Sequence, residues 1–278
     1  MTRLGREKSA VKAVTFDLWE TLLFEKDGSD LERRAIRCRA LAQVLKRSGL
    51  DVSVKEVELA LGETISSMMK IWDKNRDVSH LDMIRIFFKY ASKGKLSPKD
   101  ALLEELSKAY VSPLFKVPPY VNPDACEALD WLMDQNKQTG IICNTGLTPG
   151  TELRKFLSQA GVAEYFRVMV FSNEVGIRKP DRRIFNFTAR ALGAKPEEIV
   201  HVGDNLKSDV WGAKNAGFRA IHLSGTAGQD KIAESDPESL VSLSRNLGSL
   251  KLERIKPDKT ISSLSAFKKS IEELEAEI

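Results

Sequence analysis

The chain has 278 residues, of which 42% are hydrophobic and 29% are charged. These proportions are those of a globular protein and exclude a disordered or fibrous chain. The formal net charge is only +4, and so small a surplus does not indicate nucleic-acid binding. Residues 25–116 hold 18 Lys and Arg against 14 Asp and Glu, so this one segment accounts for the whole surplus.

The cysteines and the N-terminus indicate where the protein resides. Cys38, Cys126 and Cys143 lie far apart, and the three histidines are not spaced as metal ligands. This pattern is typical of reduced thiols and argues against a disulfide framework or a zinc site. The first residues are charged, and no run approaches the ~18 apolar residues that span a bilayer. We therefore expect a cytoplasmic protein with no membrane partner.

The N-terminal part of the chain predicts one strand followed by helices. Residues 11–16 have the branched, apolar composition of a buried strand. Helical periodicity follows at 31–48, 54–73, 79–92 and 98–111, and we expect no strand between 25 and 116. The apolar face of the first helix consists of Leu31, Ala35, Cys38, Leu41 and Leu45. Val-Pro-Pro at 117–119 ends this helical segment.

From residue 120 onward, predicted strands and helices alternate. The strands are expected at 139–143, 167–171, 199–202, 219–223 and 259–262. The helices are expected at 123–137, 149–160, 181–192, 208–216 and 265–276, with a further short helix at 236–246. This alternation predicts a parallel sheet covered on both faces. The fold class is therefore α/β, a Rossmann-like doubly wound sheet formed by 1–24 and 117–278, with an inserted helical domain at 25–116.

Polar residues follow the predicted strands, at the edge where an open parallel sheet binds its ligands. The first strand is followed by Asp17-Leu18-Trp19-Glu20-Thr21, and the 139–143 strand by Asn144-Thr145-Gly146. The next two strands are followed by Gly176-Ile177-Arg178-Lys179-Pro180-Asp181 and by Gly203-Asp204-Asn205-Leu206-Lys207-Ser208-Asp209. Carboxylates suit Mg²⁺, a lysine suits phosphate, and a carboxylate can act as a nucleophile. Together they indicate phosphoryl transfer.

With these four segments in this order, the chain resembles the haloacid dehalogenase-like hydrolase superfamily. The resemblance covers about 11–223, and the helical insertion is similar to the C1-type cap of that superfamily. It implies that Asp17 is the nucleophile, that Thr21 orients the first loop and that Lys179 neutralises the nucleophile and the phosphate. It further implies a Mg²⁺ cofactor held by Asp17, the backbone carbonyl of Trp19, Asp204 and Asp209.

The resemblance also implies a small anionic, phosphorylated substrate. Asn144 follows the second motif position, and Thr145 supplies a hydroxyl only if its loop shifts. We count both as candidate substrate-binding residues, together with Arg33 and Arg37 of the cap. The arginines are alternatively a solvated helix face. The sequence leaves the substrate's identity and the oligomeric state open.

Two positions depart from the superfamily pattern. Trp19 stands where the phosphatases carry an aspartate that acts as general acid and base, and Cys143 stands where they carry serine or threonine. General acid–base catalysis is worth about 10²–10⁴-fold in rate. We therefore expect a weak phosphatase, or one whose substrate has a good leaving group such as an acyl phosphate. Glu20 is a possible replacement acid, and Cys143 is expected to be a buried apolar residue.

Two other functions stay open at this point. The 2-haloacid dehalogenases also carry an aromatic residue two positions after the nucleophile, but they lack the Gly-Asp that this chain keeps at 203–204. A metal carboxylate in a metal-free enzyme would repel its anionic substrate, so the phosphatase ranks higher. The third function is a non-catalytic, ligand-binding or regulatory homologue, which the departures at Trp19 and Cys143 suggest.

Overall fold

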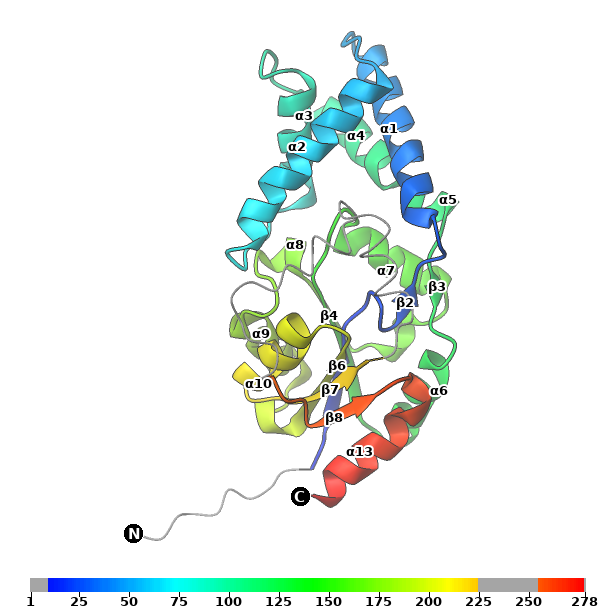
Figure 1. Ribbon diagram of the computed structural model, residues 1–278, viewed down its shortest axis with the longest axis vertical. Helices are drawn as coiled ribbons and strands as arrows, with labels where there is room; N and C mark the ends of the chain where they lie inside the picture. Colours follow the sequence, from blue (N-terminus) through cyan, green and yellow to red (C-terminus); the bar gives the residue numbers. More distant parts are fainter. Residues whose placement is uncertain (1–9, 225–254, 278) are drawn as a thin grey trace, which may run out of the picture.

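The protein, a computed structural model that describes residues 10–224 and 255–277, is built on one six-stranded parallel sheet (Figure 1). The strand order is β5-β4-β1-β6-β7-β8. The strands are β1 (Ala13–Phe16), β4 (Gln138–Cys143), β5 (Val168–Phe171), β6 (Ile199–Gly203), β7 (Arg219–Leu223) and β8 (Lys259–Ile261). The sequence predicts all six, and the helix expected at 236–246 lies outside the described residues.

Strand β1 lies in the middle of the sheet and is completely buried. It pairs with β4 on one side and with β6 on the other. Val14 and Phe16 point into one hydrophobic cluster, whereas Ala13 points into the cluster on the opposite face. The chain order reverses at β1, which is the switch point where open α/β sheets bind ligands. Asp17, the next residue, is therefore held at the centre of the binding edge.

Helices cover both faces of the sheet, which confirms the doubly wound α/β fold. The cluster that contains Phe16 also receives α6 (Ala125–Asp134), α7 (Gly150–Gln159) and α13 (Phe267–Ala276). The opposite cluster receives α9 (Arg182–Leu192) and α10 (Gly212–Asn215). The helix expected at 208–216 begins instead with a π-helix, η3 (Leu206–Trp211), and continues as α10. The remaining short elements are α8 (Ser172–Val175), η1 (Ala163–Tyr165), η2 (Pro196–Glu198) and η5 (Leu264–Ala266).

Four longer helices lie over the carboxyl ends of the strands (Figure 1). They are α1 (Ser29–Arg47), α2 (Val54–Trp72), α3 (His80–Ala91) and α4 (Asp100–Val111), and they share a hydrophobic cluster of their own. The chain enters them after β2 (Leu23–Phe24) and leaves through α5 (Pro113–Lys116) and β3 (Tyr120–Val121). Strands β2 and β3 pair antiparallel. This pair is not predicted by the sequence, because two residues are too few to show a periodicity.

The beginning of α1 differs from the sequence expectation. The sequence places Leu31 and Ala35 on the apolar face, but both are exposed, Leu31 by 58%, whereas Arg33 and Arg37 are each 5% exposed. The later residues Cys38, Leu41 and Leu45 do face the helical cluster. The first turns of α1 thus turn Arg33 and Arg37 inward, and the expectations for Leu31 and Ala35 are wrong.

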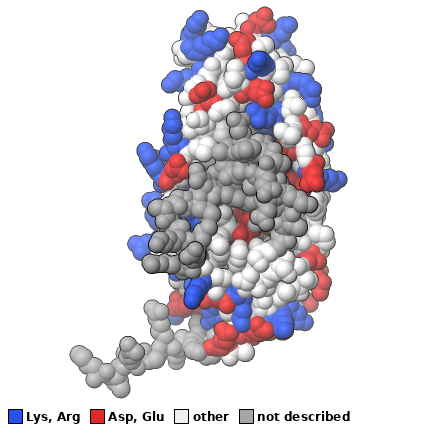
Figure 2. All heavy atoms as spheres, in the orientation of Figure 1, with Lys and Arg blue, Asp and Glu red and all other residues white. Residues whose placement is uncertain are grey.

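The surface charge is mixed where the basic surplus of the sequence lies. In the face shown in Figure 2, the Lys and Arg side chains of the upper part, which holds α1–α4, are interspersed with Asp and Glu. Arg33 and Arg37, which belong to this surplus, are buried. Within 10–224 and 255–277, none of the helices has the length and apolar character needed to cross a membrane.

The surroundings of His80, the first residue of α3, predict that the helical layer is sensitive to acid. Its ring lies against Tyr110 at a centroid distance of 5.5 Å, and burial lowers the pKa of His80 from 6.5 to about 4. As pH falls, the unfolded chain therefore binds this proton before the folded chain does, so stability is lost between pH 6.5 and 4.

We expect His80→Gln to remove this part of the pH dependence. Urea unfolding at pH 7 and pH 4.5 should show a smaller stability loss in the variant than in the wild type, by roughly 2–3 kcal/mol. An equal loss in both proteins would show that His80 does not titrate with folding.

Candidate active site

The site is built around a buried lysine that bridges two carboxylates. Lys179 Nζ lies 2.7 Å from Asp17 Oδ1 and 2.6 Å from Asp209 Oδ1. The lysine and Asp209 side chains are each 1% exposed, whereas Asp17 is 13% exposed. Asp17 follows β1, Lys179 precedes α9 and Asp209 lies in η3. The three segments meet at the sheet edge, as the sequence predicts for residues that follow neighbouring strands.

Asp209 is fixed by partners on both oxygens. In addition to Lys179, its Oδ1 lies 3.3 Å from His201 Nε2, and its Oδ2 accepts the backbone N–H of Asn205 at 3.0 Å. The other ring nitrogen of His201 lies 2.9 Å from Thr15 Oγ1. A continuous set of polar contacts therefore runs from β1 and β6 inside the sheet to Lys179. These contacts hold the Lys179 ammonium on its buried side, and Asp17 is its partner on the side of the pocket.

Burial and the neighbouring charges shift the pKa values of Asp17, Asp209 and Lys179 in different directions. Burial raises the pKa of Asp17 to about 6, against the opposing effect of Lys179. The pKa of Asp209 stays well below its usual range despite burial, because Lys179 and His201 stabilise its charge. The two carboxylates raise the pKa of Lys179 although burial alone would lower it. The charged forms of Asp209 and Lys179 therefore stabilise each other, whereas the charged form of Asp17 is stabilised less than that of Asp209.

Asn144 holds the backbone of Lys179. Its Nδ2 donates to the Lys179 carbonyl at 2.9 Å, and its Oδ1 accepts the Lys179 N–H at 2.8 Å. The amide thus uses one donor and one acceptor to join the loops after β4 and before α9. It lines the pocket, but its carbonyl oxygen and one of its two N–H groups bind the Lys179 backbone. Asn144 is consequently better placed to position the lysine than to contact a substrate.

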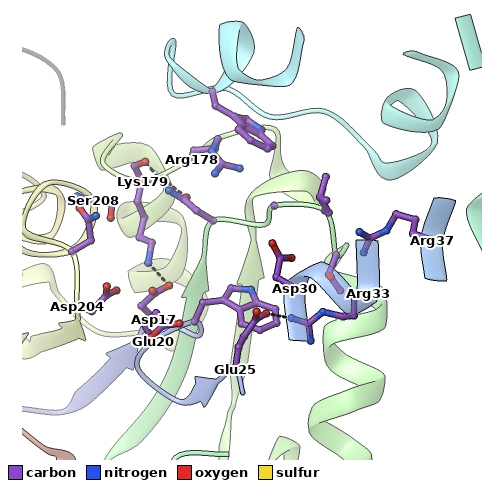
Figure 3. A pocket seen from close by; sticks show the side chains of 17 residues that line it. Asp17, Glu20, Glu25, Asp30, Arg33, Arg37, Arg178, Lys179, Asp204 and Ser208 are labelled. Carbon is purple, nitrogen blue, oxygen red and sulfur yellow. Dashed lines mark hydrogen bonds and ion pairs between the residues drawn. The ribbon is translucent and has the colours of Figure 1, made fainter. Parts of the chain in front are cut away.

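A pocket of about 170 Å³ opens in front of Asp17. On the sheet side, Asp17, Lys179, Asp204 and Ser208 line it; on the helical side, Glu25, Asp30, Arg33 and Arg37 line it (Figure 3). Residues 30, 33 and 37 share one face of α1 because their spacing follows the helical repeat. Trp19, Glu20 and Arg178 also line the pocket, together with Trp72, Asn144, Asn205 and residues 146–148.

The two arginines from α1 are held differently. Arg33 pairs with Glu25 and donates Nη1 to the Val117 carbonyl at 3.0 Å. Arg37 donates Nε to the Tyr110 carbonyl at 2.9 Å, and its guanidinium lies 4.9 Å from the centre of the Tyr110 ring. Neither belongs to a solvated helix face, because both are buried. Figure 3 shows both guanidinium groups on the helical side of the pocket.

Asp17, Asp204 and Asp209 form a cluster that suits a hard cation. One carboxylate oxygen from each lies within 4.8 Å of the others, and oxygen donors of this kind suit Mg²⁺. The Asp204 backbone is fixed by its carbonyl, which lies 2.9 Å from His222 Nε2. Both oxygens of Asp209 have protein partners, and Asp209 does not line the pocket, whereas Asp17 and Asp204 do. Asp17 and Asp204 are therefore the better placed ligands.

Three other residues singled out in the sequence lie away from the pocket wall. Thr21 is buried; its carbonyl accepts Asn122 Nδ2 at 2.9 Å, while its hydroxyl has no hydrogen-bond partner among the described residues. The Thr145 hydroxyl lies 3.1 Å from Ser172 Oγ, and the residue as a whole is 1% exposed, so the structure does not place this hydroxyl at a substrate. Cys143 is completely buried in an apolar cluster, as expected.

The sequence does not single out several residues that shape the site. Arg178 lines the pocket beside Lys179, and Asp77 contacts Arg178 from the loop between α2 and α3. Arg178 could have been suspected from its place in the Gly-x-x-Lys-Pro-Asp segment. Asp77, Glu25 and Asp30 give no sequence signal, because they come from segments whose placement over the sheet is a tertiary property.

The loop after β1 has an unusual backbone at Glu20. This residue has a φ of 57°, in the left-handed region, and it is 9% exposed. Residues other than glycine rarely adopt this conformation, and strained backbones concentrate at functional sites. Glu20 lines the pocket, and its carboxylate lies beside Asp17 in Figure 3.

A doubly wound sheet with a carboxylate nucleophile candidate at its switch point and a helical layer above defines a class of α/β hydrolases. The sequence profile of the haloacid dehalogenase-like hydrolase family matches residues 11–217. The chain belongs to this family and is a hydrolase.

Individual relatives agree with this membership. The chain is 29% identical over 232 residues to a glyceraldehyde 3-phosphate phosphatase of Methanopyrus kandleri, covering 82% of this chain and 90% of that protein. The solved structure of a haloacid dehalogenase-like (HAD) phosphatase from Thermococcus onnurineus is 26% identical in sequence, with a TM-score of 0.56. The match covers 93% of this chain and 97% of that chain. A 2-haloacid dehalogenase structure from Pseudomonas syringae is 21% identical, with a TM-score of 0.63 and coverage of 95% and 99%. The last similarity shows the fold alone.

Gly203 allows Asp209 to approach the end of β6. A Cβ added at Gly203 would lie 2.4 Å from Asp209 Cγ, whereas one added at Gly62 in α2 meets no atom within 4 Å. We expect Gly203→Ala to lower the free energy of unfolding by about 1–3 kcal/mol through overpacking and to reduce phosphatase turnover by displacing Asp209 from Lys179.

Gly62→Ala is the matched control, and it should stabilise the protein by about 0.5–1 kcal/mol because alanine is the better helix former. Denaturant unfolding measures both effects. Wild-type stability in Gly203→Ala would contradict the close approach of Asp209.

Proposed function

We propose that this hydrolase removes phosphate from a small phosphorylated metabolite through an aspartyl-phosphate on Asp17. The observation that carries the proposal is the Asp17–Lys179 contact of 2.7 Å at the floor of the pocket, beside Asp204. Asp17 can attack phosphorus, and Lys179 offsets negative charge on the transferring group. The phosphatases among its relatives support this chemistry.

We propose Mg²⁺ as the cofactor. Asp17, Asp204 and the backbone carbonyl of Trp19 would hold it, while Asp209 would support the site through Lys179 and the Asn205 backbone. When bound, Mg²⁺ would offset phosphate charge and orient the phosphoryl group. The retained Asp204 also favours a phosphatase over a metal-free haloacid dehalogenase, whose substrate anion it would repel.

The chain's own residues divide the reaction into two steps. An Asp17 oxygen bonds to phosphorus as the bond to the leaving-group oxygen breaks. Water then attacks the phosphorus, which releases inorganic phosphate and restores the Asp17 carboxylate. Trp19 cannot protonate the leaving group. Glu20, the next residue in the chain, is a carboxylate that lines the same pocket. We therefore propose that the enzyme prefers leaving groups that depart without a proton, such as the carboxylate of an acyl phosphate.

Residues 25–116 act in this proposal as a cap over a core of 1–24 and 117–278. The separate hydrophobic cluster of α1–α4 supports the division. The cap presents Arg33 and Arg37 to the pocket, and we propose that they bind the anionic substrate. Arg33 pairs with Glu25. Of these two arginines, Arg37 is the one that forms no ion pair with a carboxylate among the described residues. We also propose a reducing, cytoplasmic location, in line with the three free cysteines.

Asp17→Asn should abolish hydrolysis of both acetyl phosphate and p-nitrophenyl phosphate, because an amide is not a competent nucleophile. Chelation with EDTA should stop the wild-type enzyme, and added Mg²⁺ should restore it. Phosphate release measures each outcome. Full turnover by Asp17→Asn would contradict the proposed function, and halide release from 2-chloropropionate in EDTA would establish the dehalogenase instead.

Arg37→Gln tests the cap's part in substrate binding. We expect the KM of phosphorylated substrates to rise about tenfold or more, the size of one charged hydrogen bond. Arg34→Gln is the control, because Arg34 is on the same helix but pairs with Glu58 at 3.3 Å and does not line the pocket. Equal KM values in the two variants would show that Arg37 does not bind the substrate.

A further inference from the structure

A cap residue outside the known motifs is buried against the core. Asp77 lies in the loop between α2 and α3, and its side chain is 2% exposed. Its Oδ2 is 2.7 Å from Arg178 Nη1 and accepts Ser172 Oγ–H at 2.5 Å. Its Oδ1 accepts Trp72 Nε1–H at 3.1 Å and the backbone N–H of Val78 at 2.9 Å. Thr145 Oγ1 also donates to Asp77 Oδ2, at 3.4 Å. Of the five donors to this one carboxylate, Arg178, Ser172 and Thr145 belong to the core, whereas Trp72 and Val78 belong to the cap.

The backbones of the two layers are joined at the same place. The Asp77 N–H donates to the Gly176 carbonyl at 3.1 Å, and the Arg178 N–H donates to the Asn75 carbonyl at 3.0 Å. These bonds flank an antiparallel bridge between Arg76 and Ile177. The loop after α2 and the loop before α9 therefore pair like two short strands. The Asp77 carboxylate adds an ion pair with Arg178 at the same place.

The contacts of Asp77 lead directly to the active-site loops. Arg178 precedes Lys179, and its Nη1 also donates to the Thr145 carbonyl at 2.5 Å. Thr145 follows Asn144, whose amide clamps the Lys179 backbone. The Arg178 guanidinium in turn lies 4.5 Å from the centre of the Trp72 ring. The residues next to Asn144 and Lys179 are therefore held by a carboxylate that belongs to the cap.

The burial of this ion pair makes it a strong constraint. The Arg178 side chain is 7% exposed, and burial lowers its pKa while Asp77 opposes the shift. Removing one partner of a buried ion pair leaves the other charged and desolvated, which is far more costly than losing a surface pair. Movement of this end of the cap away from the core would have to separate the pair and expose both charges.

We propose that Asp77 is a positioning residue that couples the seating of the cap to the placement of Lys179 and Asn144, a role that rests on the proposed function of this site. Asp77 does not touch the pocket in front of Asp17; it acts through Arg178, Ser172 and Thr145. When the cap is seated, both catalytic loops are held in place. When this contact is broken, the loops lose their common support.

The test combines amide hydrogen exchange with steady-state kinetics on full-length protein. In Asp77→Asn, exchange in segments 72–78 and 172–179 should accelerate about tenfold or more, because the pairing of the two loops opens more often. With p-nitrophenyl phosphate, kcat should fall at least as much as KM rises, because Lys179 is misplaced. A loss confined to KM would instead reduce Asp77 to part of the pocket wall and overturn the proposal.

Asp82→Asn is the matched control. Asp82 also belongs to the cap and pairs with Arg85 at 2.8 Å, but that pair is half exposed, so exchange and kinetics should stay at wild-type values. Ser172→Ala is the milder second variant: it removes one donor to Asp77, lies outside the pocket wall, and should accelerate exchange in the same two segments.

The exchange readout separates this proposal from the proposed function. Wild-type exchange in both Asp77→Asn and Ser172→Ala overturns the proposal, whatever the kinetics show. If Asp77→Asn fails to fold, Ser172→Ala decides alone. If the wild-type protein hydrolyses neither acetyl phosphate nor p-nitrophenyl phosphate while exchange responds as expected, the contact between cap and core stands. The phosphatase function and the positioning role that depends on it then fall.

Discussion

The buried ammonium of Lys179 is the constraint on which the site depends. An isolated ammonium could not remain charged in this environment, because burial disfavours the charged form. Asp17 and Asp209 together reverse that effect and raise the pKa of Lys179. Asp209 is fixed in turn by His201 and by the Asn205 backbone. The lysine can therefore present a permanent positive charge to Asp17 without contact with bulk solvent.

This arrangement explains why the fold and the chemistry cannot be separated. The Asp17 carboxylate follows a completely buried strand in the middle of the sheet, and Asp209 is supported by a histidine inside the neighbouring strand, which is also completely buried. Lys179 itself comes from a loop whose backbone is clamped by Asn144 and whose preceding residue is held by the cap residue Asp77. Sheet, connecting loops and cap thus all contribute to the position of one ammonium group.

The sequence predicts the sheet well, because short apolar strands and amphipathic helices carry strong periodic signals. It also predicts that Asp17, Lys179, Asp204 and Asp209 converge, because parallel strands bring their carboxyl ends to one edge. It fails where tertiary packing decides. Leu31 is exposed because α1 turns Arg33 inward. The Thr145 hydroxyl contacts the Ser172 hydroxyl and does not face the pocket. The contacts of Asp77 join segments about a hundred residues apart, which no local pattern reports.

The central claim is that Asp17 carries the phosphoryl group during turnover. Its most direct test is acid quenching of the enzyme during the steady state with acetyl phosphate and Mg²⁺, followed by mass spectrometry of the proteolytic peptide that contains Asp17. The account predicts a phosphorylated peptide whose modification maps to Asp17, is sensitive to hydroxylamine, and is absent in Asp17→Asn. Rapid turnover with no phosphorylated Asp17, or with the phosphate on another residue, would contradict it.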